Sequence, residues 1–154
     1  MRLLKDDELV PLVTGANPIV TQLPLPPTLP PAAGGGGVVD PWYGKDSSVQ
    51  PASLDLHVGH ILLPGTEDGK PGSVTSPKTD HVLRFGHTAV VTTLEELRLR
   101  GDLAAFGFPP ASISSRGLLM TNPGHVDPGY AGRLRFTVIN VGKEDIPLRR
   151  GDVL

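Results

Sequence analysis

The chain has 154 residues, enough for one domain with a substantial core, and its 38% hydrophobic and 19% charged residues are typical of soluble globular proteins. A formal net charge of −2 gives no electrostatic reason to expect a long nucleic-acid polymer as partner, although a few local cations can still hold a small anion. The absence of cysteine excludes disulfides, thiolate nucleophiles and the Cys-ligated zinc site that zinc-dependent base deaminases need.

The N-terminal region carries none of the signals of secretion or membrane insertion. Acidic residues stand at positions 6–8, where a signal peptide would place its apolar stretch. No apolar run approaches the length needed to cross a bilayer. The sequence therefore predicts a cytoplasmic protein without a membrane partner.

Residues 1–48 are predicted to form a short helix followed by an arm. The helix is expected within residues 1–15, although Pro11 limits its regularity. Residues 17–37 run from prolines, which favour extended polyproline II, into four flexible glycines. No Gly-Lys-Ser/Thr follows those glycines, so a linker or surface arm is favoured over a phosphate-binding loop.

Residues 49–154 are predicted to form one β domain of short strands and many turns, because glycine and proline are abundant and apolar residues alternate. An alternating segment at 54–58 leads through apolar residues 61–63 into a turn at Pro64-Gly65, and 65–80 is a turn-rich, exposed loop. Further strands are predicted at 87–93, 118–121, 133–140 and 146–148. The expected architecture is all-β, a jelly-roll-like barrel.

The clearest of these strands, residues 133–140, is expected to present two different faces. Side chains alternate along a strand, so Leu134, Phe136 and Val138 should share one apolar face. The opposite face should carry Arg133, Arg135, Thr137 and Ile139.

The stretch G-H-V-D-P-G-Y-A-G, residues 124–132, is the most specific in the chain. It places Asp127 and Tyr130 on one tight turn between two strands. There the carboxylate can meet a water or a sugar hydroxyl, and the ring can meet a flat sugar face. Asp-Pro-Gly is also common turn chemistry, and on the residues alone the simpler interpretation, that Asp127 caps its own turn, is favoured.

Resemblance to a known family changes that weighting. Residues 124–132 resemble the third signature of trimeric dUTPases, G-x-I-D-x-x-Y-x-G, and the matching D-P-G-aromatic-x-G turn of dCTP deaminases. Residues 49–59, V-Q-P-A-S-L-D-L-H-V-G, resemble the deaminase opening Q-P-A-S-x-D-L-x-L-G, and 88–105 resemble a later deaminase segment. This implies a distorted jelly-roll-like β-barrel of the dUTPase type, forming a homotrimer with sites between subunits. It also favours strand and turn over the amphipathic helix that the composition of residues 94–107 allows.

The resemblance also implies roles for individual residues. Asp127 would hold the 3′-hydroxyl of a deoxynucleoside triphosphate and, as in dUTPases, orient the attacking water. Tyr130 would pack on the deoxyribose and exclude a 2′-hydroxyl. Asp55 would lie near the triphosphate and its expected Mg²⁺, while Ser112 and Arg116 match part of the phosphate-binding signature R-S-S-x-x-R.

Several positions depart from the family pattern. Ala111 and Ile113 replace an arginine and a serine of the phosphate signature. Thr137 stands where dCTP deaminases keep their catalytic glutamate, and a threonine cannot serve as the general acid/base for the cytosine ring. In dUTPases this position is ordinarily apolar, so the change affects dUTP hydrolysis less. Arg133 and Arg135 share the strand face of Thr137 and are candidates for phosphate contacts. Most surface arginines on a strand, however, bind no ligand.

The histidines are not expected to build a metal site. His57 and His60 have metal-like spacing for a helix, but on a strand residues three apart point to opposite faces. The other three histidines form no close cluster in the sequence.

Three functions remain open from the sequence. The first is release of pyrophosphate from dUTP, with Asp127 positioning water and Mg²⁺ bridging the phosphates. The second is deamination of dCTP, which the missing glutamate disfavours. The third is a catalytically degenerate module that senses or sequesters a deoxynucleotide, or serves as a structural trimer. The sequence stops at Leu154, within what the family uses as a strand, so both a trimmed chain and a shortened relative are open.

Overall fold

The computed structural model describes residues 53–65, 73–74 and 76–154, together with Glu8, Leu12 and residues 20–21 and 49–50. Glu8 and Leu12 are helical, in agreement with the short N-terminal helix that the sequence predicts. Nearly all of the predicted proline- and glycine-rich arm lies outside the described residues. No helix in the described part of the chain is long and apolar enough to cross a membrane.

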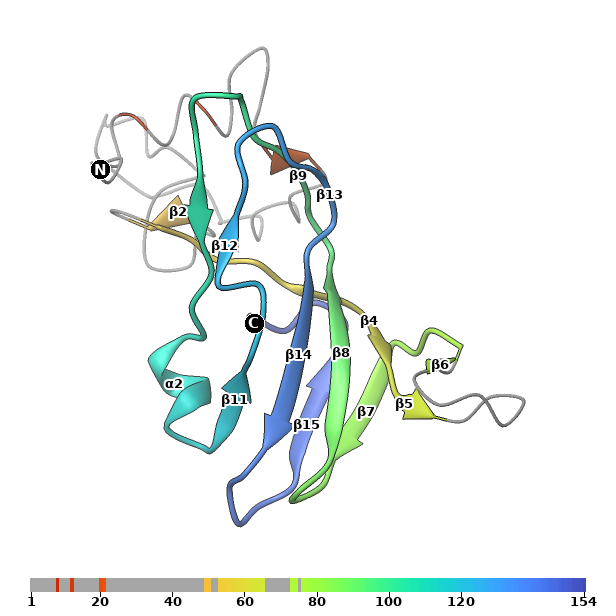
Figure 1. Ribbon diagram of the computed structural model, residues 1–154. Helices are drawn as coiled ribbons and strands as arrows, with labels where there is room; N and C mark the ends of the chain where they lie inside the picture. Colours follow the sequence, from red (N-terminus) through yellow and green to blue (C-terminus); the bar gives the residue numbers. More distant parts are fainter. Residues whose placement is uncertain are drawn as a thin grey trace, which may run out of the picture.

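The described residues are mostly strand, which confirms the all-β prediction (Figure 1). In chain order the strands are β1 (Val20–Thr21), β2 (Val49–Gln50), β3 (Ser53–Leu54), β4 (Val58–Leu62), β5 (Pro64–Gly65), β6 (Ser73–Val74), β7 (Asp80–Leu83), β8 (Thr88–Thr93), β9 (Glu96–Arg98), β10 (Ala105–Phe106), β11 (Leu118–Met120), β12 (His125–Val126), β13 (Ala131–Gly132), β14 (Arg135–Asn140) and β15 (Ile146–Arg149). One helical turn, α2 (Ala111–Ser114), precedes β11.

A four-stranded antiparallel sheet in the order β11-β14-β8-β4 forms the centre of the molecule (Figure 1). Phe136 of β14 pairs with Val91 of β8, and Val91 in turn pairs with Ile61 of β4. The register shifts near Gly59, where a Cβ would lie 2.5 Å from the carbonyl oxygen of Thr93. Only glycine allows the two backbones to approach so closely.

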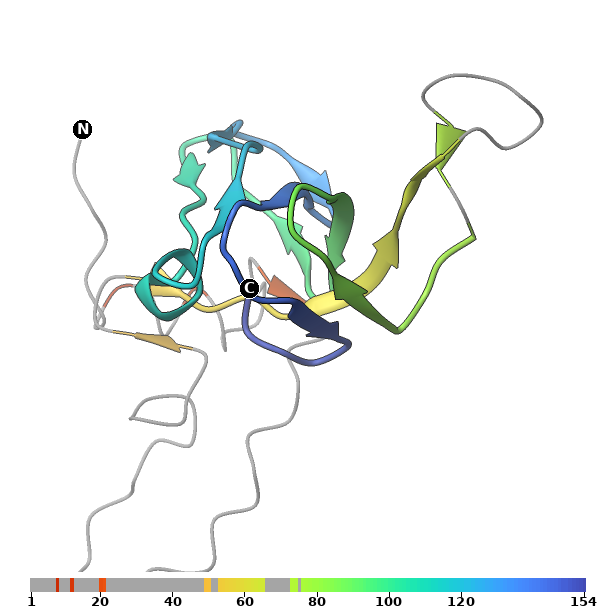
Figure 2. The same cartoon turned by 90° about the horizontal axis from the view of Figure 1, so that it is seen from below.

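Shorter ribbons complete the fold around this sheet. The β7–β15 ribbon contacts β4, and β13 and β1 flank β9 in a small three-stranded sheet. The β5–β6 hairpin projects away from the rest of the described chain, as both views show (Figures 1 and 2). Strands β10 and β12 form a separate pair that leads directly into the D-P-G turn.

The core lies against the inner face of the central sheet, and the predicted alternation of β14 is confirmed. Leu134, Phe136 and Val138 are at most 4% exposed, whereas Arg135 is exposed and Thr137 half-buried. Burial of an apolar side chain of this size contributes about 1.5–3 kcal/mol to folding. The remaining buried hydrophobic residues are Val58, Ile61, Leu62, Leu83, Ala89, Val91, Leu97, Leu99, Leu118, Val126, Ile146, Leu148 and Leu154.

Residues 94–107 form strand and turn rather than helix, as the resemblance favoured. Leu97 and Leu99 are buried, while Arg98 and Arg100 between and after them are exposed. This period of two is that of a strand, and it prevails over the helix-forming composition of the segment.

The expected turn at Pro64-Gly65 and part of the expected loop after it are wrong. These two residues form β5, which pairs with Ser73 and Val74 of β6, so the base of the predicted loop is a hairpin. Proline is tolerated there because β5 is a short peripheral strand, where one fewer backbone donor costs little. The loop also ends earlier than expected, because β7 begins at Asp80.

Candidate functional site

A cavity of about 310 Å³ opens beside the start of β14. It is lined by Pro123, His125, Val126, Asp127, Tyr130, Arg133, Leu134 and Arg135. These residues come from β12, the D-P-G turn and the segment that leads into β14. The stretch 124–132, the most specific in the sequence, therefore supplies four of the eight lining residues.

Backbone contacts hold the D-P-G turn in place. Val126 is buried and pairs with Ala105, which fixes β12 on β10. The turn itself closes through a hydrogen bond from the Tyr130 N–H to the Asp127 carbonyl oxygen, 3.1 Å long. Gly129 has φ +78°, a left-handed conformation that glycine adopts without strain.

The carboxylate of Asp127 remains at the cavity rather than closing the turn. Its side chain is 79% exposed, and Oδ1 lies 3.3 Å from Nε2 of His125, whose side chain is 68% exposed. Because a backbone carbonyl closes the turn, the carboxylate oxygens can reach a bound hydroxyl or water. The role of Asp127 toward a ligand stays a prediction.

Tyr130 is held rigidly at the cavity edge. Its hydroxyl donates a 2.7 Å hydrogen bond to the backbone carbonyl of Arg133, and its half-buried ring packs against the core. Gly132, with φ +141°, makes the tight return of the chain beneath the ring. A ring fixed at both ends presents a defined apolar surface to a ligand, because little rotamer freedom remains to be lost on binding.

Two arginines give the cavity positive charge. Arg133 is half-buried, and one guanidinium nitrogen lies 3.5 Å from the Thr93 carbonyl oxygen. Arg135 is exposed and lies one strand period further along β14. The strand begins at Arg135, two residues later than predicted, so Arg133 lies just before β14; both arginines line the cavity.

Thr137 lies on the same face of β14 but is absent from the cavity lining. Asn122 Oδ1 accepts its backbone N–H at 2.9 Å, and its carbonyl oxygen accepts the N–H of Thr121 at 3.0 Å. Asn122 thus takes the place of a strand partner where β11 ends. Thr137, the position where the resemblance implies a glutamate in dCTP deaminases, is half-buried and lies outside the cavity lining.

The other predicted residues are not brought to this cavity. Ser112, in α2, and Arg116, just after it, are exposed, and neither lines the cavity. Asp55 is half-buried between β3 and β4, also outside the lining. Of the residues given roles by the family signatures, only Asp127 and Tyr130 line this cavity.

Sequence reasoning did not identify His125 as a site residue. A usable signal was present, because His125 precedes Asp127 by two positions and side chains two apart on an extended segment share a face. Pro123 was marked only as part of a turn. Its place in the lining depends on the Asn122 contacts with β14, which no local pattern indicates.

No group of three or more His, Asp or Glu side chains suited to a metal ion occurs among the described residues. The His57 ring hydrogen-bonds Glu95 rather than a second histidine. The expected Mg²⁺ thus has no protein cage in this part of the chain. That is compatible with a magnesium ion held chiefly by the phosphates of a nucleotide and by water, which is common for Mg²⁺.

Comparison with known proteins gives a consistent set of relatives. Residues 33–154 match the model of the dCTP deaminase-like family. A protein of Methanothermobacter thermautotrophicus named dCTP deaminase, dUMP-forming, is 30% identical over 125 residues, 71% of this chain and 64% of the relative. A protein of Mycobacterium ulcerans with the same name is 32% identical over 127 residues, 73% of this chain and 66% of the relative.

A solved structure shows the same fold. The crystal structure of 2′-deoxycytidine 5′-triphosphate deaminase from Agrobacterium tumefaciens superposes with a TM-score of 0.67 at 22% identity, covering 99% of this chain and 46% of that chain. The chain thus spans less than two-thirds of the length of the two curated relatives and less than half of the crystal chain.

Proposed function

Because the chain belongs to the dCTP deaminase-like family, we propose that it binds a pyrimidine deoxynucleoside triphosphate in the cavity beside β14. One observation carries the proposal: the D-P-G turn brings Asp127 and Tyr130 into the same cavity as two arginines. A carboxylate, a fixed aromatic ring and two cations are the groups that a deoxyribose with attached phosphates requires.

In this proposal Asp127 and Tyr130 recognise the sugar. The exposed carboxylate of Asp127 accepts a hydrogen bond from the 3′-hydroxyl, and the ring of Tyr130 packs against the deoxyribose. Movement of the ring away from a 2′-hydroxyl would break its 2.7 Å bond to Arg133, so a ribonucleotide is disfavoured. The site therefore selects deoxynucleotides over ribonucleotides.

The reaction that the cavity favours is release of pyrophosphate from dUTP. Water adds to the α-phosphorus, pyrophosphate leaves and dUMP remains. Asp127 is the only carboxylate among the cavity-lining residues and is therefore the group that can orient this water. Magnesium, bound with the triphosphate, would neutralise charge on the phosphate oxygens.

Deamination of dCTP is the second candidate, because the relatives are named dCTP deaminases. Thr137 argues against it. Proton transfer to and from the cytosine ring needs a general acid/base, and the threonine hydroxyl has no such capacity near neutral pH. A module that binds the nucleotide without catalysis is the remaining alternative.

The proposal includes assembly as a homotrimer with sites shared between subunits. Ser112 and Arg116 match part of the family's phosphate signature, yet neither lines the cavity of its own chain. In a shared site they would be donated by a neighbouring copy. Asp55 would contribute in the same way near the triphosphate.

One experiment separates the three activities. The protein is incubated with dCTP and with dUTP in the presence of Mg²⁺, and the products are identified by chromatography. Conversion of dUTP to dUMP and pyrophosphate supports the proposed hydrolase, and formation of dUTP or ammonia from dCTP supports the deaminase. Binding of either nucleotide without product supports the non-catalytic module.

A further inference from the structure

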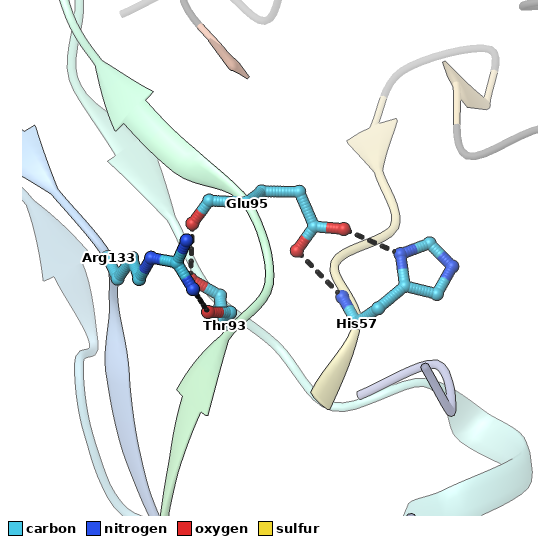
Figure 3. A network of polar contacts seen from close by, with 4 residues as sticks. All are labelled: His57, Thr93, Glu95 and Arg133. Atoms are coloured by element: carbon cyan, nitrogen blue, oxygen red, sulfur yellow. Dashed lines mark hydrogen bonds and ion pairs between the residues drawn. The ribbon is translucent and has the colours of Figure 1, made fainter. Parts of the chain in front are cut away.

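Two buried polar residues outside the cavity belong to a series of hydrogen bonds that ends at the cavity wall. Thr93, the last residue of β8, and Glu95, just before β9, are both 0% exposed. Figure 3 shows them between His57 on one side and Arg133 on the other. Burial of a hydroxyl or carboxylate is unfavourable unless the group is hydrogen-bonded, so their partners indicate their role.

The carboxylate of Glu95 is anchored to His57 at the far end of this series. Oε1 lies 2.7 Å from Nδ1 of the His57 ring, and Oε2 accepts the His57 backbone N–H at 2.9 Å. The His57 carbonyl oxygen in turn accepts the N–H of Leu94 at 2.8 Å. Leu94 and Glu95 are therefore joined by three hydrogen bonds to His57, the residue just before β4.

Thr93 connects Glu95 to the cavity wall through hydrogen bonds to Leu134. Its hydroxyl donates to the Glu95 carbonyl oxygen at 2.8 Å and accepts the Leu134 N–H at 3.1 Å. Its backbone N–H donates to the Leu134 carbonyl oxygen at 3.0 Å. Leu134 lines the cavity, so both of its backbone polar groups are held by one residue.

Two neighbouring residues of the cavity wall, Arg133 and Tyr130, are linked to Thr93 as well. A guanidinium nitrogen of Arg133 lies 3.5 Å from the Thr93 carbonyl oxygen, and the Arg133 carbonyl oxygen accepts the Tyr130 hydroxyl at 2.7 Å. A connected series of contacts thus runs from His57 through Glu95 and Thr93 to Tyr130. Each link is a hydrogen bond between named groups.

We propose that Thr93 is a positioning residue for the nucleotide cavity, with the Glu95–His57 pair as its anchor. The proposal rests on the proposed function, because it assigns Thr93 to the placement of Arg133, Leu134 and Tyr130 around the nucleoside. Valine has nearly the shape of threonine and is better suited to an apolar strand face. The two hydrogen bonds of the Thr93 hydroxyl compensate for its complete burial.

The test compares Thr93→Val, which keeps the shape and removes the hydroxyl, with Thr93→Ser, which keeps the hydroxyl. Thr88→Val makes the same change at the other end of β8, where Thr88 pairs with Ile139 away from the cavity. Calorimetric titration with dUTP and UTP in Mg²⁺, well below the melting temperature of each variant, measures affinity in the folded state. The Leu134 amide is followed by hydrogen exchange as a readout that needs no ligand.

Thr93→Val should raise the dissociation constant for dUTP about tenfold, as expected for loss of buried hydrogen bonds that order a site. Its preference for dUTP over UTP should fall, and its Leu134 amide should exchange faster. Thr93→Ser and Thr88→Val should bind within about threefold of the unaltered chain, a difference below 1 kcal/mol. If Thr93→Val does not fold, His57→Phe serves instead, since it keeps an aromatic ring and removes the ring donor to Glu95; it should weaken dUTP binding in the same direction.

The outcomes distinguish this inference from the proposed function. Thr93→Val or His57→Phe proteins that are less heat-stable but bind dUTP with unchanged affinity and sugar preference would show a purely structural role and overturn the inference alone. If the unaltered chain binds neither dUTP nor dCTP, the proposed function fails, and the positioning role falls with it.

Discussion

The hydroxyl of Tyr130 donates a 2.7 Å hydrogen bond to the backbone carbonyl of Arg133, three residues further along the chain. This bond fixes the tyrosine ring over the return of the chain through Gly132, at the edge of the cavity. The bond also joins Tyr130 and Arg133, the two ends of segment 130–133, and both residues line the cavity. The position of the ring is therefore set by the backbone of the wall itself.

Sugar selectivity should depend on this fixed ring. The unaltered chain is expected to bind dUTP or dCTP better than UTP or CTP, because the ring excludes a 2′-hydroxyl. Tyr130→Ala should lose the discrimination while the fold survives, since the ring is half-buried at the edge of the core. Tyr130→Phe keeps the ring but not the hydroxyl. Its preference for deoxynucleotides should lie between those of the unaltered chain and Tyr130→Ala. Calorimetry measures all four affinities, and equal affinities of the unaltered chain for ribo- and deoxynucleotides would remove the role assigned to Tyr130.

Replacement of Asp127 by asparagine should separate binding from catalysis. The introduced side chain keeps the shape and a carbonyl oxygen for the 3′-hydroxyl but cannot orient water as a carboxylate does. Release of pyrophosphate from dUTP should fall by about 10²–10⁴-fold while dUTP affinity changes little. Pyrophosphate assays and calorimetry on the same preparation check this prediction. Undiminished hydrolysis by Asp127→Asn would assign the water-orienting role to another group.

Thr137 should prevent deamination of dCTP. Its hydroxyl has no useful proton-transfer capacity near neutral pH, and loss of a general acid/base costs about 10²–10⁴ in rate. Ammonia release from dCTP should therefore be negligible, which a coupled ammonia assay measures. Robust ammonia release would show that another residue supplies the proton transfer.

Local sequence patterns predict much of the fold but only part of the candidate site. Alternation along residues 133–140 predicts the buried Phe136 and the exposed Arg135, because one face of the strand meets the core. The D-P-G turn predicts that Asp127 and Tyr130 lie together, because only two residues separate them.

Contacts between distant segments could not be predicted in this way. Glu95 is fully buried against His57, 38 positions earlier, and nothing in the local pattern around either residue marks a partner. Asn122 replaces a strand partner for Thr137, which decides where β11 ends and where the cavity begins. Pro64-Gly65 looks like a turn but forms a strand, since its partner β6 lies beyond the segment that a local pattern covers.

The chain is expected to assemble as a homotrimer. Ser112 and Arg116 are exposed and lie outside the cavity of their own chain. In the proposed shared site they would come from another copy. Light scattering at working concentration should give the mass of three chains, and Arg116→Ala should weaken triphosphate binding without changing that mass. A monomer that binds dUTP with full affinity would contradict the shared site.

The other predictions depend on binding of a pyrimidine deoxynucleoside triphosphate beside β14, at the D-P-G turn. The most direct test is a titration of the isotope-labelled chain with dUTP and Mg²⁺, followed by amide NMR shifts, with sodium triphosphate and Mg²⁺ as the control for phosphate alone. Saturable shifts concentrated in residues 123–135 are expected, and they should be larger with dUTP than with triphosphate. Shifts that are absent, equal in the two titrations, or confined to residues away from this segment would contradict binding at this turn.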